Sequence, residues 1–242
     1  MTLLAEDPVL WDVVFKMPME RLRFIEARAR EAGPAVLDVG CATGMTCHAL
    51  REAGMAPVGV DINARFIDAA RAKDPTGEYH VGDMRTFQLS RAFDLLICLG
   101  TTFAYNLTNR QVAQTLRNFH GHLRPGGRLI VDVVNAIAFT GAQPFRRLSR
   151  HSFNREGEEA VATIRHGLDL RAQTMTEQVT WRRKDHAVRK DPAESLRLLF
   201  PQELAFHLEV AGFIDVELLD GWGGDAQGFG GRRLIALATR PG

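Results

Sequence analysis

The sequence has few cysteines, almost no net charge and no long apolar run, and each absence excludes a class of protein. Its three cysteines are an odd number without a Cys-x-x-Cys spacing, which argues against a disulfide framework and a zinc ribbon. The 30 Lys and Arg residues against 29 Asp and Glu lack the basic excess of a general nucleic-acid binder. No apolar run approaches the ~18–20 residues that span a bilayer, and the acidic N-terminal stretch differs from a secretory signal. These absences predict a cytoplasmic protein with no membrane partner.

The pattern that is present indicates an α/β fold. Residues 35–134 alternate short apolar runs with amphipathic stretches, which predicts parallel strands joined by right-handed helical crossovers. Two more strands, expected at 214–219 and 232–238, should pair as a hairpin. We therefore expect a Rossmann-like, doubly wound, mainly parallel seven-stranded sheet with an antiparallel last hairpin. The other strands are expected at 35–39, 57–61, 79–81, 93–99 and 128–134.

The first of these strands leads into a glycine-containing turn. Asp38 lies one residue before the end of the strand, and the run Gly40, Cys41, Ala42 and Gly44 places two residues without a Cβ where a ligand must approach the backbone. A dinucleotide-binding turn would read Gly-x-Gly-x-x-Gly, whose middle glycine is replaced here by alanine. The turn therefore disfavours NAD, although the glycines could also serve only a tight turn.

Acidic residues at the ends of the second and third strands predict an adenosine site without phosphates. Asp61 lies 21 residues after Gly40, where a carboxylate can accept hydrogen bonds from both ribose hydroxyls. Ile62 beside it can cover one face of a purine. Asp83 offers an acceptor to an adenine amino group, and Met84 offers an apolar side chain. An Asp at a strand end is a helix N-cap or a surface ion-pair partner about as often as it is a ligand-binding residue.

These segments together resemble class I S-adenosylmethionine-dependent methyltransferases. The resemblance rests on five successive motifs, VLDVGCATG, VGVDI, VGDM, FDLLICLGTTFAY and LRPGGRLIVDV. It implies S-adenosylmethionine as the cofactor. Asp38, Gly40, Cys41, Ala42 and Gly44 would lie at the methionine end, Asp61 and Ile62 at the ribose and purine, Asp83 and Met84 at the adenine, and the Leu99 carbonyl at the methionyl amino group.

The layout also resembles glycine-type and amino-sugar N-methyltransferases of bacterial metabolism. The resemblance implies an N-terminal helical lid at residues 1–32, a cofactor-binding core at 33–135 and 201–242, and an antiparallel β insertion at 136–200 on the substrate side, all in one domain. This family often has an N-terminal Tyr and an Arg for the methionine carboxylate. This chain has Trp11 or Phe15 in that region, and Lys16, Arg21 or Arg23 for the carboxylate.

The acceptor is expected to be a small metabolite, methylated on nitrogen more readily than on oxygen. The Asp-Pro-Pro-Tyr type of motif that marks base methylation is absent after the fourth strand, and no cysteine follows a proline as a pyrimidine-methylating nucleophile would. We expect no metal. The insertion nevertheless holds 12 Lys and Arg against 8 Asp and Glu, a net charge of +4. This local excess of positive charge suits an anionic or nucleic-acid acceptor better than the net charge of the whole chain does. An RNA or protein methyltransferase and a non-catalytic module that binds an S-adenosyl ligand are the alternatives.

The catalytic candidates lie at the carboxyl edge of the expected sheet and in the insertion. Tyr105 follows the fourth strand, where open α/β folds bind ligands, although it could equally be a packing aromatic. Asp132 ends the fifth strand, and its carboxylate could bind an ammonium group or be structural. His151, like His166 and His186, offers an imidazole base near neutral pH, with a solvated surface role as the alternative. Strands of the insertion could also build a homodimer.

Overall fold

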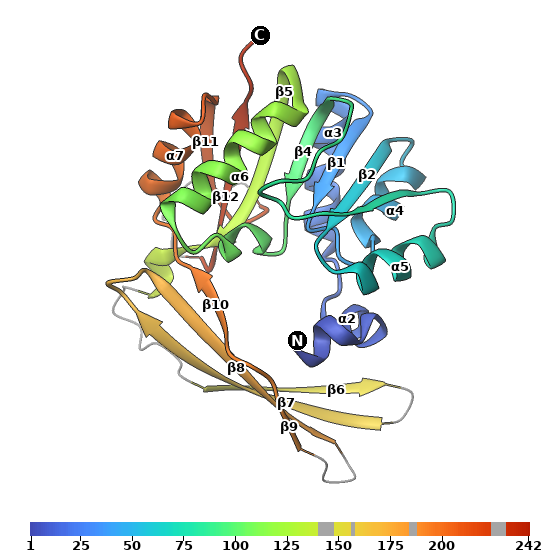
Figure 1. Ribbon diagram of the computed structural model, residues 1–242, viewed down its shortest axis with the longest axis vertical. Helices are drawn as coiled ribbons and strands as arrows, with labels where there is room; N and C mark the ends of the chain where they lie inside the picture. The colour runs from blue at the N-terminus through green and yellow to red at the C-terminus, as the bar shows by residue number, and fades with distance from the viewer. Residues whose placement is uncertain (140–147, 156–157, 184–187, 224–230) are drawn as a thin grey trace.

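The computed structural model contains two β-sheets, one below the other in Figure 1. It describes residues 1–139, 148–155, 158–183, 188–223 and 231–242. The larger sheet has seven strands in the order β11-β12-β5-β4-β1-β2-β3, and the second has five strands. The carboxyl ends of β1 (Ala35–Val39) and β4 (Phe93–Cys98) are directed toward the second sheet.

The seven-stranded sheet has the predicted topology. β1 pairs in parallel with β2 (Ala56–Asp61) and β4, while β3 (Glu78–Val81) extends one edge and β5 (Leu123–Val134) follows β4. β12 (Arg233–Thr239) is antiparallel to both β5 and β11 (Ile214–Asp220), as the expected hairpin requires. The structure therefore confirms the Rossmann-like sheet with an antiparallel last hairpin.

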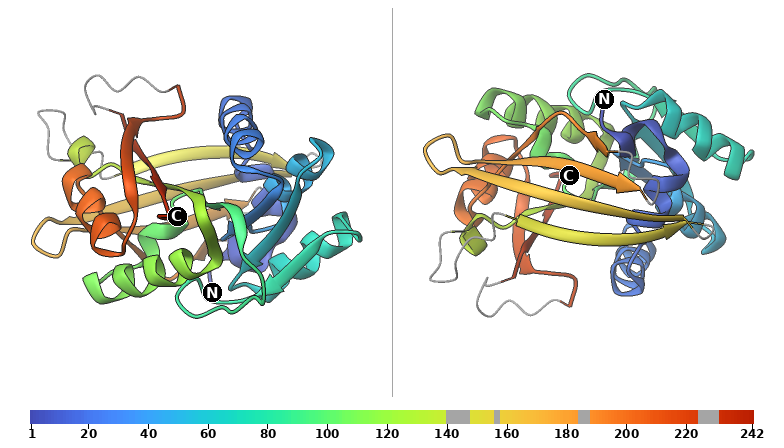
Figure 2. Two further views of the ribbon diagram at one scale, coloured as in Figure 1. Left: turned by 90° about the horizontal axis from the view of Figure 1, so that it is seen from above. Right: turned by 90° about the horizontal axis from the view of Figure 1, so that it is seen from below.

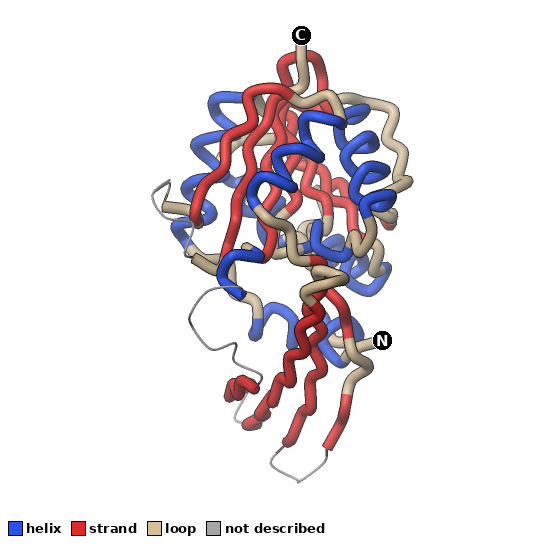
Figure 3. The backbone as a smooth tube through the Cα atoms, turned by 90° about the vertical axis from the view of Figure 1, so that its left-hand side faces the viewer, coloured by secondary structure: helices blue, strands red, loops and turns tan. Residues whose placement is uncertain are grey.

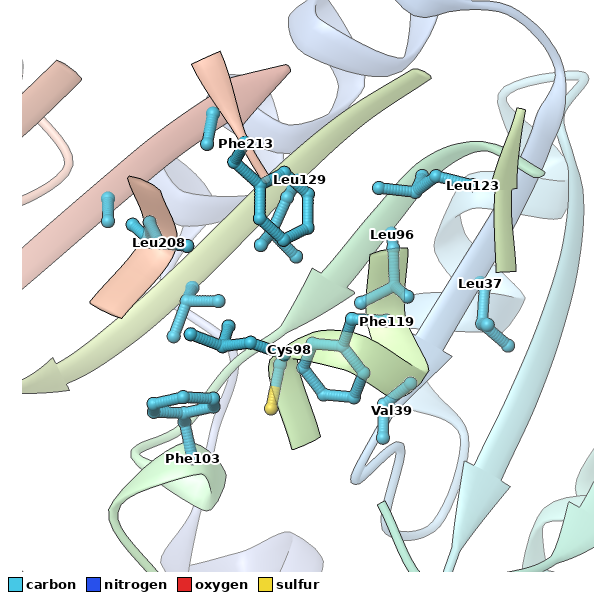
Figure 4. Close-up of a cluster of buried hydrophobic side chains, with 14 of the residues drawn as sticks. Leu37, Val39, Leu96, Cys98, Phe103, Phe119, Leu123, Leu129, Leu208 and Phe213 are labelled. Atoms are coloured by element: carbon cyan, nitrogen blue, oxygen red, sulfur yellow. The ribbon is translucent and has the colours of Figure 1, made fainter. Parts of the chain in front are cut away.

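Helices cover both faces of this sheet, which explains why its strands read as continuous apolar runs. Val36 of β1 belongs to a buried cluster with residues of α3 (Met19–Ala32) and α4 (Met45–Glu52). Leu37 belongs to the cluster on the other face, which includes residues of α6 (Asn109–His122) and α7 (Pro201–Val210). Figure 4 shows the second of these clusters, with Phe119 of α6 between strands and helix. α5 (Ala64–Lys73) packs against β2 and β3, and Asn63 caps it by accepting the N–H of Arg65.

The N-terminal 32 residues form three helices. α1 (Leu3–Glu6) ends at Asp7, whose side chain accepts the N–H of Leu10 at 2.9 Å and starts α2 (Pro8–Val14). Pro18, in an extended conformation, precedes α3. The sequence predicted a helical segment over residues 1–32, and the break between α1 and α2 follows from the Asp-Pro pair, because Asp is a good N-cap and Pro suits the first helical turn. None of the described helices is long and apolar enough to cross a bilayer.

The insertion forms the second sheet, as expected. Its strands are antiparallel, and they are β6 (Leu148–Arg155), β7 (Glu158–Asp169), β8 (Thr174–Arg183), β9 (Val188–Lys190) and β10 (Glu194–Arg197). Trp181 and Ala162 are buried on one face against Leu10 of α2. The view from below in Figure 2 shows this sheet crossing beneath the larger one, and Figure 3 shows the N-terminal helices beside it. α2 is therefore packed between the two sheets.

Candidate active site

The loop after β1 contacts both the carboxyl end of β2 and the segment that follows β4. The backbone N–H groups of Gly40 and Cys41 donate to the Val60 carbonyl at 2.7 and 3.1 Å. Gly40 has a φ of +80°, and a Cβ built on it would lie 2.4 Å from Cγ2 of Thr102, in the segment after β4. Glycine is needed here because both the left-handed backbone and the close approach exclude a side chain. Gly44, also at φ +80°, directly precedes α4.

Asp61 is held by two backbone donors at the end of β2. Its carboxylate accepts the N–H of Ala42 at 2.9 Å and the N–H of Asn63 at 2.8 Å. Burial raises the pKa of Asp61, and the backbone hydrogen bonds oppose this effect. A carboxylate has about four lone-pair sites, so two remain for a ribose diol. Ile62 is 66% exposed beside it, which leaves an apolar side chain for a purine face.

The segment after β3 is fixed by its own hydrogen bonds. Asp83 forms a two-point ion pair with Arg85, at 2.8 and 2.6 Å, which lowers the pKa of its carboxyl. This partner was not foreseen from the sequence, and it occupies part of the carboxylate expected to accept from adenine. Met84 receives a contact from Asn106 Nδ2 at 3.3 Å to its sulfur, and its carbonyl accepts from Asn118. Met84 is thus positioned from α6 and the segment after β4.

Asp132 has a partner on each carboxylate oxygen. Oδ1 accepts the N–H of Thr101 at 2.8 Å, and Oδ2 lies 2.5 Å from the Arg233 guanidinium. Its side chain is fully buried, and burial raises its pKa while Arg233 opposes the rise. Asp132 therefore holds the turn after β4 in which the Leu99 carbonyl accepts the N–H of Thr102 at 3.3 Å. The structure gives Asp132 a clear positioning role, and a catalytic role for it stays a prediction.

Arg21 of α3 lies near the buried carboxylates of Asp38 and Asp132. Burial lowers the pKa of Arg21, and the two carboxylates oppose this effect. Burial also raises the pKa of Asp38 to about 7, against the attraction of Arg21. The Nε of Arg21 is buried and has no hydrogen-bond partner within the described part of the chain. Of the three cations proposed for the methionine carboxylate, Lys16 and Arg23 are exposed, so the structure favours Arg21.

The N-terminal helices contact the cofactor-side loops. Asp12 of α2 accepts a hydrogen bond from the Thr43 hydroxyl and forms an ion pair with Lys73 of α5. The Asn63 side chain donates to the Ala5 carbonyl at 2.7 Å. The expected N-terminal lid therefore lies against the loops after β1 and β2, where the candidate cofactor residues are.

Tyr105 is the catalytic candidate that connects the two sheets. It ends the 3₁₀ helix η1 (Thr102–Tyr105), and its hydroxyl donates to Glu194 of β10 at 3.3 Å. His151, in contrast, is exposed on β6 opposite Ala162, with its ring stacked on Phe153 of its own strand. His186 lies outside the described residues. The Tyr105 hydroxyl thus contacts the second sheet, whereas His151 is an exposed residue on a strand of that sheet.

Sequence reasoning missed two glutamates on the sheet face that carries Trp181. Glu177 lies between Met175 and Val179 in the two-residue alternation of β8, so it shares their otherwise apolar face. Glu194 is the register partner of Glu177 on β10. A charged residue that interrupts an apolar alternation was the signal that could have identified this pair.

Comparison with known proteins finds similarity over part of this chain. Residues 36–127 match the family model described as "Methyltransferase domain". This segment, which holds β1 to β4 and the start of β5, is similar to a methyltransferase domain. Over 159 residues, 61% of this chain and 63% of the relative, it is 30% identical to the dTDP-4-amino-2,3,4,6-tetradeoxy-D-glucose N,N-dimethyltransferase of Saccharopolyspora spinosa. The chain therefore spans less than two thirds of the length of that curated relative.

Solved methyltransferases share the fold of the whole chain. The CcbJ methyltransferase of Streptomyces caelestis superposes with a TM-score of 0.79 at 20% identity, over 96% of each chain. The sugar N-methyltransferase KedS8 of Streptoalloteichus sp ATCC 53650 superposes with a TM-score of 0.76 at 24% identity, over 92% of this chain and 86% of that one. At these identities the likeness establishes the methyltransferase fold, which includes the residues beyond the methyltransferase domain.

Proposed function

We propose that this chain is an S-adenosylmethionine-dependent N-methyltransferase that acts on the amino group of a small, sugar-like acceptor. The observation that carries the proposal is the pair of facing surfaces within one methyltransferase fold. Asp61 and the glycine-containing loop lie on one side, and Tyr105 with two sheet glutamates lies on the other. The similarity to an amino-sugar N,N-dimethyltransferase supports the same acceptor class.

The residues at the carboxyl edge fit S-adenosylmethionine by their chemistry. The cofactor supplies an electrophilic methyl group on a sulfonium, so the protein has to bind it and orient a nucleophile. The buried Nε of Arg21, which has no hydrogen-bond partner among the described residues, can donate to the methionine carboxylate, and Asp61 keeps lone pairs for the ribose hydroxyls. The remaining contacts come from the Leu99 carbonyl at the amino group, Ile62 and Met84 at the adenine, Asp83 at its amino group, and the backbone from Gly40 to Gly44.

The acceptor side is assigned to Tyr105 and the insertion, residues 136–200. Nitrogen is preferred over oxygen because Glu177 and Glu194 place negative charge on the face next to Tyr105, which favours a protonated amine over a neutral hydroxyl. Asp132 would act indirectly, by holding the turn after β4. His151 lies on the same face of the second sheet, opposite Ala162, and a catalytic role for it stays a prediction.

S-adenosylhomocysteine release measures the proposed reaction directly. The purified chain is incubated with S-adenosylmethionine and either dTDP-4-amino-2,3,4,6-tetradeoxy-D-glucose or its 4-hydroxy counterpart, and products are identified by mass. We expect methylation of the amine, with little or none of the alcohol. Methylation of the alcohol alone would contradict the nitrogen assignment, and cofactor binding with no release for any amine in a wider panel would favour a non-catalytic binding module.

We extend the proposal to a cytoplasmic homodimer that has no nucleic-acid partner. The three cysteines are free and buried, as expected in a reducing compartment. Within the described residues β6 pairs only with β7, so one edge of the second sheet is open to a second copy. Light scattering in solution measures the molecular mass, and a value near 27 kDa would contradict the dimer.

A further inference from the structure

A row of polar side chains crosses the second sheet from β6 to β10 and ends at Tyr105. The Ser149 hydroxyl lies 3.2 Å from His166 Nε2, and His166 Nδ1 lies 3.3 Å from the Glu177 carboxylate. Glu177 is directly opposite Glu194 in the register of β8 and β10, and Glu194 accepts the Tyr105 hydroxyl. Each member thus lies next to another on one face of the sheet.

This row interrupts a face that is otherwise apolar. His166 lies between Ile164 and Leu168 in the alternation of β7, and Leu168 packs in a buried cluster with Met175 and Leu196. Charged and polar groups on such a face cost free energy of desolvation unless they are partnered. Ser149, His166 and Glu177 are half-buried on this face, whereas Glu194 and Tyr105 at the end of the row are exposed. The face therefore offers a row of polar groups that leads from the half-buried part of the sheet to an accessible end.

Tyr105 places the end of this row next to the cofactor edge. The charges of Glu194, Glu177 and Asp61 all act on its phenol and, together with burial, raise its pKa above the ordinary value. Asp61 belongs to the cofactor edge, whereas the two glutamates belong to the second sheet. Tyr105 follows β4 at the carboxyl edge of the larger sheet, and its hydroxyl contacts β10, so this side chain joins the two surfaces.

We propose that Glu194, supported by Glu177 and His166, acts through Tyr105 to receive the proton that the acceptor amine must lose. This inference rests on the proposed function. Because Tyr105 donates its proton to Glu194, its oxygen presents lone pairs to the acceptor N–H. Tyr105 is then the catalytic residue, and Glu194 is a positioning residue that holds the proton.

The proposed reaction has two steps, and protons and electrons balance in each. In the first, an acceptor ammonium gives a proton to the Tyr105 oxygen while the Tyr105 proton moves to the Glu194 carboxylate, which leaves a neutral amine. In the second, the nitrogen lone pair forms the N–C bond as the C–S bond breaks, and its electron pair remains on sulfur as a thioether. The proton on Glu194 then leaves to water. Each further methylation of the same nitrogen needs the same proton removal.

The surroundings of Glu194 suit a group that holds a proton transiently. Burial raises its pKa, and so do the charges of Glu177 on β8 and Asp191 just before β10. The Tyr105 hydrogen bond from η1 and the charged N-terminus of the chain oppose the rise. Removal of the Glu177 charge should therefore move the titration of Glu194 to lower pH.

Tyrosine NMR tests the Tyr105–Glu194 pair without any acceptor. The chain has only two tyrosines, so labelling with ¹³Cζ-tyrosine gives two signals, and Y105F assigns them. We expect the Tyr105 signal to titrate between about pH 4 and 8, with a midpoint above the ordinary Glu value of about 4.3. The titration should vanish in E194Q and move to lower pH in E177Q. E209Q, on the exposed surface of α7, is the matched control and should leave both signals unchanged.

Kinetics with dTDP-4-amino-2,3,4,6-tetradeoxy-D-glucose test the proton transfer. We expect kcat of E194Q to fall on the order of 100-fold near neutral pH, in the range of general base catalysis, with unchanged S-adenosylmethionine affinity. The deficit should shrink as pH rises and solvent deprotonates the amine. A merely structural defect would give a deficit independent of pH.

Three results separate the possible failures. A Tyr105 signal that titrates identically in wild type and E194Q would overturn the pair. An active wild type with an E194Q variant equally active at all pH values, or with a pH-independent deficit, would overturn the proton transfer alone. A wild type that binds the cofactor but methylates no amine would overturn the proposed function and this inference with it.

Discussion

Replacement of Asp61 tests the cofactor assignment most directly. Its carboxylate already accepts two backbone N–H groups, from Ala42 at 2.9 Å and Asn63 at 2.8 Å, so a substitution affects both folding and binding. Hydrogen bonds to a charged group contribute about 1.5–3 kcal/mol, and their loss in Asp61→Ala should weaken S-adenosylmethionine binding by roughly 10- to 150-fold. In the same variant the N–H groups of Ala42 and Asn63 lose their acceptor, which should lower the free energy of unfolding by about 1–3 kcal/mol.

A second variant separates these effects. Asp61→Asn keeps one acceptor oxygen, so its ligand-free stability should lie closer to the wild type than that of Asp61→Ala. Its neutral amide still lacks the charged acceptor for the ribose hydroxyls, so the affinity loss should persist. Titration calorimetry measures binding, and thermal unfolding without ligand measures stability, with Glu209→Ala as a surface control. An Asp61→Asn affinity within twofold of the wild type would refute the ribose contact.

Three further substitutions address the surrounding site. Gly40→Ala should destabilise the fold more than Gly54→Ala, since both glycines have positive φ but only a Cβ at position 40 meets Thr102, and thermal unfolding measures the difference. The wild type should lose stability relative to Asp38→Asn as pH rises from about 4 to 7. In this range folded wild-type protein, with an Asp38 pKa of about 7, holds a proton that the unfolded chain has lost. Urea unfolding measures both pH profiles, and equal profiles would contradict this reasoning. Arg21→Met should weaken S-adenosylmethionine binding about 10-fold or more in calorimetry but leave binding of adenosine unchanged, since adenosine has no carboxylate.

The α/β half could be predicted from the sequence because its determinants are local. The strand Ala35–Val39 lies between Gly33-Pro34 and Gly40, and the structure begins and ends it at the same residues. Asn63 is a residue type that favours the N-cap position, and it caps α5. Such patterns depend on residues a few positions apart, so sequence spacing is enough to recognise them. The exception at Asp7-Pro8 is also local, since Pro8 had no place in the predicted helical pattern.

The candidate site was predicted in part, and the missing part depends on distant contacts. Asp61 and the glycine positions follow directly after strands, where topology alone places them at one edge. The partners of Asp132 come from residues 31 and 101 positions away, and the Tyr105–Glu194 contact joins residues 89 apart. Single-sequence reasoning had no means to pair these residues, because the register of the second sheet and its position below the first decide the contacts.

The position of α2 links the two halves of the proposed site. Asp12 contacts Thr43 in the loop after β1, while Leu10 on the same helix packs against Trp181 of the second sheet. Residues two apart on a helix point in different directions, so one short helix supports both surfaces at once. A displacement of α2 that uncovers the cofactor loop must also remove the apolar support of the sheet. We therefore expect cofactor access and the packing of the proposed acceptor face to depend on the same seven-residue helix.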